Sequence, residues 1–75
     1  MSVESLPKFT GPAARLWAKL PREMRKLYIS NVWCKNCGSR VAITDFTGTV
    51  RDGNLLLVGL CIECHGDVAT VIEMP

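Results

Sequence analysis

The spacing of apolar residues predicts an amphipathic helical segment over residues 12–29. Thr10 can cap its first turn, in which Pro12 is tolerated. Pro21 interrupts the segment, because proline lacks the N–H of a helical hydrogen bond and its ring clashes with the preceding turn. We expect either one helix kinked at Pro21 or two short helices in near alignment, and the poor capping ability of Leu20 favours the kink. The apolar positions on the shared face are Ala13, Leu16, Trp17, Leu20, Met24, Leu27 and Tyr28.

Shorter apolar runs after this segment predict strands. Residues 40–46 alternate between two faces, with Val41 and Ile43 on one face and Phe46 on the other. Glycine, aspartate and asparagine residues over 47–54 predict a flexible turn. The expected strands span residues 29–33, 40–46, 55–60 and 68–73.

The length of the chain fits one small domain. Its 75 residues divide into a loose lead-in over 1–11, the helical segment over 12–29 and a strand region over 30–75. A hydrophobic fraction of 48% and a charged fraction of 21% are typical of a globular protein and exclude wholesale disorder. A domain of this size buries only about 60% of the surface of its unfolded chain, so its core needs additional stabilisation.

Four cysteines in two Cys-x-x-Cys pairs can provide that stabilisation by binding a metal ion. Two intervening residues let the chain turn tightly, and two such turns direct four sulfur atoms toward one ion in a tetrahedron. Zinc is the ion we expect, although four thiolates also suit iron. Two disulfides would need an oxidising compartment, which nothing in the sequence indicates. The expected ligands are Cys34, Cys37, Cys61 and Cys64.

The residues that follow each pair fit such turns. Gly38 follows the first pair and can adopt positive φ without steric cost. His65 follows the second pair, and histidine is one of the few other residues enriched in that conformation. Because four cysteines already complete the shell, we do not expect His65 to be a ligand.

With these motifs the chain resembles the zinc ribbon family, whose members carry rubredoxin-like zinc knuckles. Cys-Lys-Asn-Cys-Gly at 34–38 matches the family's first knuckle, whereas Cys-Ile-Glu-Cys-His-Gly at 61–66 places His65 before the glycine. The resemblance covers about residues 29–75 and is to small stand-alone prokaryotic members. It implies a small metal-stabilised α+β fold, in which the N-terminal helix precedes a three-stranded antiparallel ribbon and the four cysteines are the ligands.

Zinc ribbons serve in transcription, translation and replication, and as appendages of enzymes. The resemblance therefore does not fix the function. The partner that we expect is a nucleic acid or a protein of the transcription or translation machinery. Members that cleave transcripts carry an adjacent acidic pair at the hairpin tip. This chain has Asp52 followed by Gly53 at that place, which argues against the cleavage activity.

The formal net charge of +2 is too small to indicate a partner, but its distribution is uneven. Residues 1–30 carry six Lys and Arg against two Glu, whereas residues 31–75 carry three against five acidic residues. Four basic residues form one stripe if the helix stays in phase through Pro21. Such a stripe either contacts phosphates or is the ordinary solvated face of an amphipathic helix. These residues are Arg15, Lys19, Arg22 and Lys26.

Two groups of large side chains admit more than one role. Trp33, next to the first cysteine, can stack on a nucleic-acid base or shield the thiolates from water, and we expect shielding. Trp17, Met24 and Tyr28 can dock a partner or form the core, and we expect the core because so small a sheet needs a cover.

The sequence contains no catalytic constellation, since it has one histidine and no glycine-rich phosphate loop. We expect a non-catalytic binding module that contacts nucleic acid or a protein that handles it, with no small-molecule substrate. A protein–protein adaptor that docks through its helix and a rubredoxin-like iron electron carrier are the alternatives. Because no signal peptide or membrane-length apolar stretch is visible, we expect a cytoplasmic protein.

Overall fold

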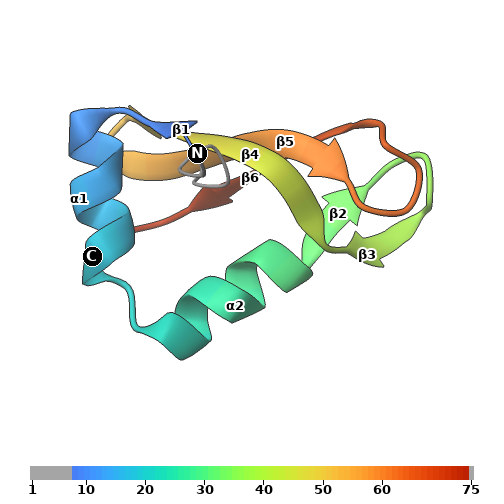
Figure 1. Ribbon diagram of the computed structural model, residues 1–75, viewed down its shortest axis with the longest axis horizontal. Coiled ribbons are helices and arrows are strands. Elements are labelled where there is room, and N and C mark those ends of the chain that lie inside the picture. The colour runs from blue at the N-terminus through green and yellow to red at the C-terminus, as the bar shows by residue number, and fades with distance from the viewer. Residues whose placement is uncertain (1–7, 75) are drawn as a thin grey trace, which may run out of the picture.

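The computed structural model describes residues 8–74, which form two helices and six short strands (Figure 1). Strands β4, β5 and β6 make a three-stranded antiparallel sheet, so a small α+β fold with such a sheet is confirmed. A separate pair, β2 and β3, is also antiparallel. The strands are β1 (Lys8–Phe9), β2 (Val32–Cys34), β3 (Ser39–Val41), β4 (Ile43–Arg51), β5 (Asn54–Cys61) and β6 (Asp67–Ile72).

Strand β1 extends the larger sheet at the edge formed by β4. It runs parallel to β4, with Phe9 opposite Gly48. The Phe9 ring lies directly over Gly48, where a Cβ atom would overlap it. The loose lead-in expected over residues 1–11 therefore contains a strand, while its residues 1–7 lie outside the described residues.

The helical segment is split at Pro21 into α1 (Gly11–Lys19) and α2 (Arg22–Ser30). Leu20 adopts extended backbone with ψ of 134°, because a residue before proline is displaced from the helical region. Its N–H donates to the carbonyl of Trp17 at 3.2 Å and ends α1. One kinked helix is therefore wrong. The alternative of two short helices is confirmed, but their near alignment is wrong, since they meet at a corner (Figure 1).

The start of α1 follows the sequence prediction. The Thr10 hydroxyl accepts a hydrogen bond from the N–H of Ala13 at 3.3 Å, and Pro12 lies in the first turn. Within residues 8–74, neither helix has the length and apolar character needed to cross a membrane.

Strands β4 and β5 form a long hairpin that closes with a turn of two residues. Asp52 and Gly53 have φ of 52° and 79°. Positive φ at both positions is what a type I′ turn requires, and its twist matches that of the strands. The flexible turn expected over 47–54 is therefore wrong, because residues 47–51 continue β4. Their threonine and valine side chains suit a strand.

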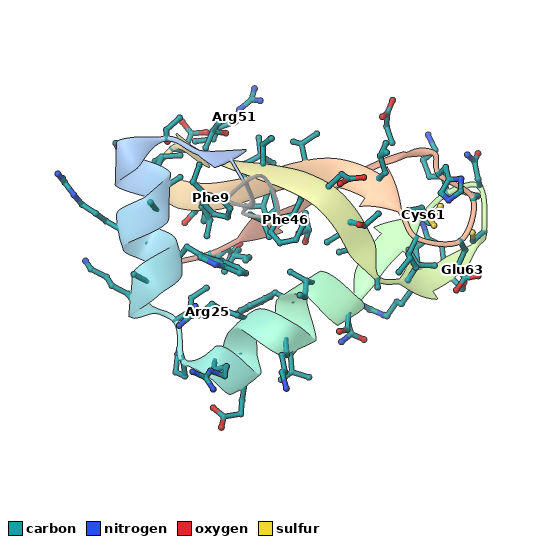
Figure 2. All side chains as sticks on the ribbon, in the orientation of Figure 1. Phe9, Arg25, Phe46, Arg51, Cys61 and Glu63 are labelled. Carbon is teal, nitrogen blue, oxygen red and sulfur yellow. The ribbon has the colours of Figure 1, made fainter. Side chains whose placement is uncertain are left out.

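A β-bulge bends β4 near its start. The register shifts between Thr44 and Thr47, so Asp45 and Phe46 together oppose the single residue Gly59. A Cβ atom on Gly59 would lie 2.7 Å from the carbonyl oxygen of Thr44 and 2.8 Å from Cα of Phe46. The strands approach so closely there that only glycine fits. The bulge directs the Phe46 ring toward the helices (Figure 2).

The buried side chains form two clusters. The helix-end cluster lies under α1, and the cysteine-end cluster lies beside the β2–β3 pair. Ile29 and Phe46 pack against both clusters and join them. The helix-end cluster contains Ala13, Leu55, Leu57 and Ile72. The cysteine-end cluster contains Val32, Cys34, Val41, Ile43, Cys61 and Val68.

Aromatic rings and one arginine fix the corner between the helices. Phe9, Trp17 and Phe46 pack with ring centroids 5.5–6.2 Å apart. The Cζ atom of Arg25 lies 5.8 Å from the Trp17 ring centroid, and its Nε donates to the Leu20 carbonyl at 3.0 Å. Arg25 on α2 thus holds the end of α1.

Helix α2 joins the core only along part of its length. Trp17 and Tyr28 pack against the helix-end cluster, in agreement with their expected core role. Met24 differs, because 38% of it is exposed, and Leu27 next to it is 56% exposed. The outer side of α2 therefore presents apolar surface.

Candidate metal centre

The four cysteines lie on two tight turns at one end of the molecule. The first knuckle (residues 34–38) joins β2 to β3, and the second knuckle (residues 61–65) joins β5 to β6. The N–H of Ile62 donates to the carbonyl of Ala42 at 3.0 Å and ties the second knuckle to the chain after β3. Figure 2 shows Cys61 and Glu63 at this end, far from the Arg51 end of the sheet.

Both knuckles have the same local structure. The N–H of Gly38 donates to the carbonyl of Cys34 at 2.8 Å, and the N–H of His65 donates to that of Cys61 at 2.9 Å. Gly38 and His65 have φ of 66° and 62°, as their residue types predict. Each turn therefore directs its two cysteines in the same way.

The four sulfur atoms all lie within 4.8 Å of one another. The Sγ atoms of Cys34 and Cys64 are 3.6 Å apart, and those of Cys37 and Cys61 are 3.8 Å apart. A tetrahedral site with metal–sulfur bonds of about 2.3 Å has sulfur–sulfur edges of about 3.8 Å. All four cysteines are free thiols. The predicted ligand residues are thus brought together in a cluster that could hold one metal ion, and the donor set fits zinc or iron.

The sulfur atoms accept N–H donors from the turns themselves. Cys61 Sγ accepts from the backbone of Glu63 at 3.3 Å and of Cys64 at 3.4 Å. Cys64 Sγ accepts from Gly66 N–H at 3.4 Å and, across the two knuckles, from Asn36 Nδ2 at 3.9 Å. Such bonds stabilise negative charge on sulfur and orient the ligands.

These surroundings give the two exposed cysteines, Cys37 and Cys64, different pKa values. The hydrogen bond from the Gly66 backbone, followed by one with Cys34, lowers the pKa of Cys64 to about 7. Partial loss of contact with water, followed by the hydrogen bond with Cys61, raises the pKa of Cys37 to about 12. In the metal-free chain at neutral pH, Cys64 therefore supplies a thiolate more readily than Cys37.

The four basic residues proposed as a stripe do not share one helix. Arg15 and Lys19 lie on α1, Arg22 and Lys26 lie on α2, and all four are exposed. Because the helix does not continue through Pro21, the phase argument that placed them on one face does not hold.

Trp33 differs from the expected shield of the thiolates. Alternation along β2 buries Val32 and Cys34 and turns Trp33 to the opposite face, where 56% of it is exposed. The contact of Asn36 with Cys64 joins residues 28 apart in the chain, and no spacing in the sequence predicts it.

Comparison of the chain with protein-family models, curated proteins and solved structures gave no match.

Proposed function

We propose that this chain is a zinc-ribbon module, in which one zinc ion held by four thiolates stabilises a non-catalytic binding domain. The observation that carries the proposal is the convergence of four sulfur atoms within 4.8 Å. The arrangement of the knuckles supports it, because one lies on a two-stranded hairpin and the other on an antiparallel sheet. When bound, zinc would cross-link these two parts of the chain.

The ligand set also supports a structural role for the ion. Four cysteines fill a tetrahedral shell, whereas catalytic zinc keeps one position open for water or substrate. The buried first cysteine of each pair, Cys34 and Cys61, anchors the site in the core. The ion would therefore contribute to folding rather than polarise a substrate.

The test is the metal content of protein purified from its natural host. Elemental analysis combined with native mass spectrometry should show one zinc ion per chain and a colourless protein. The Cys37→Ser variant should lose zinc, whereas the Ser39→Ala variant serves as a control that keeps it. A red protein with one iron per chain would replace this proposal with the electron carrier, and a metal-free folded chain would refute both.

Nucleic acid, or a protein that handles it, is the partner that the charges support. Six of the nine basic residues lie within residues 1–30. Arg15, Lys19, Arg22 and Lys26 are exposed on the two helices. If all four contact phosphates, the logarithm of the binding constant should fall with the logarithm of salt concentration with a slope of about −3 to −4. Combined Arg15→Glu and Lys19→Glu substitutions should abolish this binding, whereas Arg51→Glu should have a smaller effect.

A protein–protein adaptor is the second candidate, because Met24 and Leu27 expose apolar surface on α2. This candidate predicts no binding to nucleic acid even at low salt. It further predicts a protein partner whose affinity falls when Leu27 is changed to Asp. Strong salt-dependent binding to nucleic acid would favour the first candidate instead.

A further inference from the structure

The face of the β2–β3 hairpin opposite Cys34 carries an exposed aromatic ring and a cation. Trp33 and Arg40 are direct cross-strand partners, so both side chains lie on this face. Lys35 follows β2 in the turn of the first knuckle and lines the same pocket as Trp33, and all three side chains are exposed. Only three basic residues occur after residue 30, and two of them flank this tryptophan.

An open pocket of about 470 Å³ lies beside Trp33, between the first knuckle and β6. Buried Cys34 and Val68 line it together with the exposed side chains of Trp33, Lys35 and Asp67. Pockets that hold small organic groups have volumes in the range of about 300–1,000 Å³. The pocket therefore has room for a planar ring stacked beside the indole.

The polar groups around the pocket include hydrogen-bonding partners for a base as well as the cation Lys35. Asp67 carries a carboxylate that accepts hydrogen bonds from amino groups and repels anions. Asn36 also lines the pocket, and its amide nitrogen is directed to the sulfur of Cys64. Positive charge lies near the ring at Arg40, the cross-strand partner of Trp33, and at Lys35 on the pocket, and these cations can contact the phosphates that flank a stacked base.

We propose that Trp33, Lys35 and Arg40 form a binding site for single-stranded nucleic acid. One base stacks on the indole at the pocket, and the neighbouring phosphates contact the two cations. A single strand is required because the bases of a duplex are already stacked and cannot lie against a side chain. The proposal rests on nucleic acid as partner, and it adds a base contact on the hairpin to the phosphate contacts proposed for the helices.

The knuckles fix the geometry of this site. One wall of the pocket comes from the first knuckle and the other from β6, which follows the second knuckle. A metal ion that joins the two knuckles therefore holds both walls in place. Trp33 and Arg40 lie on paired strands and Lys35 lies in a tight turn, so little ordering is needed when a base binds.

The experiment measures the anisotropy of a short fluorescein-labelled single-stranded oligonucleotide of mixed sequence, titrated with the full zinc-loaded chain. Trp33→Ala should weaken binding about 5- to 100-fold, the range expected for loss of one stacked base. Trp33→Phe should recover part of that loss. Arg40→Ala should make the salt slope shallower by about 0.7, whereas Arg51→Ala, at the opposite end of the sheet, should not. Zinc content and circular dichroism establish that each variant is folded.

Three results would overturn the proposal, and they are distinguishable. If the unaltered chain binds but Trp33→Ala and Arg40→Ala bind equally well, the site is wrong while nucleic acid remains the partner. If an unlabelled duplex competes better than the matching single strand, stacking is wrong. If the unaltered chain binds neither at low salt, both this site and the proposed partner fail, while the metal-stabilised module stands.

Discussion

Removing the metal is expected to unfold the whole of residues 8–74 rather than the cysteine end alone. The β2–β3 hairpin is a two-stranded sheet, which is marginally stable at best in water without further support. The cross-link through the ion would hold it to the second knuckle. Once that cross-link is gone, Val32 and Val41 lose their cover, and the cysteine-end cluster opens.

The free energy lost when the metal leaves is expected to be as large as the total stability of so small a domain. A structural zinc ion bound by such a site contributes about 10–16 kcal/mol at neutral pH. Small domains have total unfolding free energies of about 5–15 kcal/mol, so the contribution of the ion equals or exceeds the whole. Loss of packing at the cysteine end is expected to reach the helix-end cluster, because Ile29 and Phe46 pack against both clusters. Opening one cluster therefore uncovers part of the other.

The two tryptophans allow both ends to be followed while a chelator is added. Trp17 lies in the helix-end cluster, and Trp33 is exposed at the cysteine end. In the Trp33→Phe variant, Trp17 is the single remaining tryptophan, because the chain has two. Its fluorescence should change at the same chelator concentration as the far-ultraviolet circular dichroism, and added zinc should restore both. The reasoning is refuted if Trp17 and the helical signal stay native after the metal has left.

Three further predictions concern the metal affinity and the stability of the loaded chain. The pKa of about 12 for Cys37 means that zinc must displace its proton at neutral pH, so affinity should rise about tenfold per pH unit for this proton and fall in acid. Competition with a chromophoric chelator between about pH 6 and 8 measures this, and a flat response contradicts it. Gly59→Ala should lower the free energy of unfolding in denaturant by about 1–3 kcal/mol, because its methyl group would meet backbone. Gly11→Ala, where no atom lies within 4 Å, should change it by less than about 0.5 kcal/mol, and equal effects would contradict the bulge. Arg25→Ala should lower the free energy of unfolding by about 1–2 kcal/mol, because it removes the hydrogen bond to Leu20 and the contact with the Trp17 ring. Arg22→Ala on the same helix should lower it little in the same assay.

The parts of the structure that depend on local chemistry could be predicted from the sequence. The spacing of the cysteines was sufficient to predict the cluster, because a Cys-x-x-Cys turn determines its own geometry. Positive φ at Gly38 and His65 and the cap by Thr10 are equally local. The turns and the cap use interactions within about five residues of the chain, and the cluster is predictable as well because two such turns share one ion.

The errors arise where distant segments decide the outcome. The predicted basic stripe requires one helix axis through Pro21, but extended backbone at Leu20 and Pro21 turns the second helix to a new direction. The corner is then fixed by the contact of Arg25 with Trp17, which no periodicity reveals. The edge strand β1 depends in the same way on Gly48, whose missing side chain makes room for the ring that covers it.

The arrangement of β2 connects the metal centre to the proposed binding surface. Cys34 and Trp33 are neighbours in the chain and point to opposite faces of one strand. A rigid strand couples the backbone positions of the two residues, so an ion bound at Cys34 would also restrain the backbone of Trp33. The proposed structural ion would therefore matter for recognition without touching a ligand, because it would hold Trp33 in place relative to β6, which forms the far wall of the pocket.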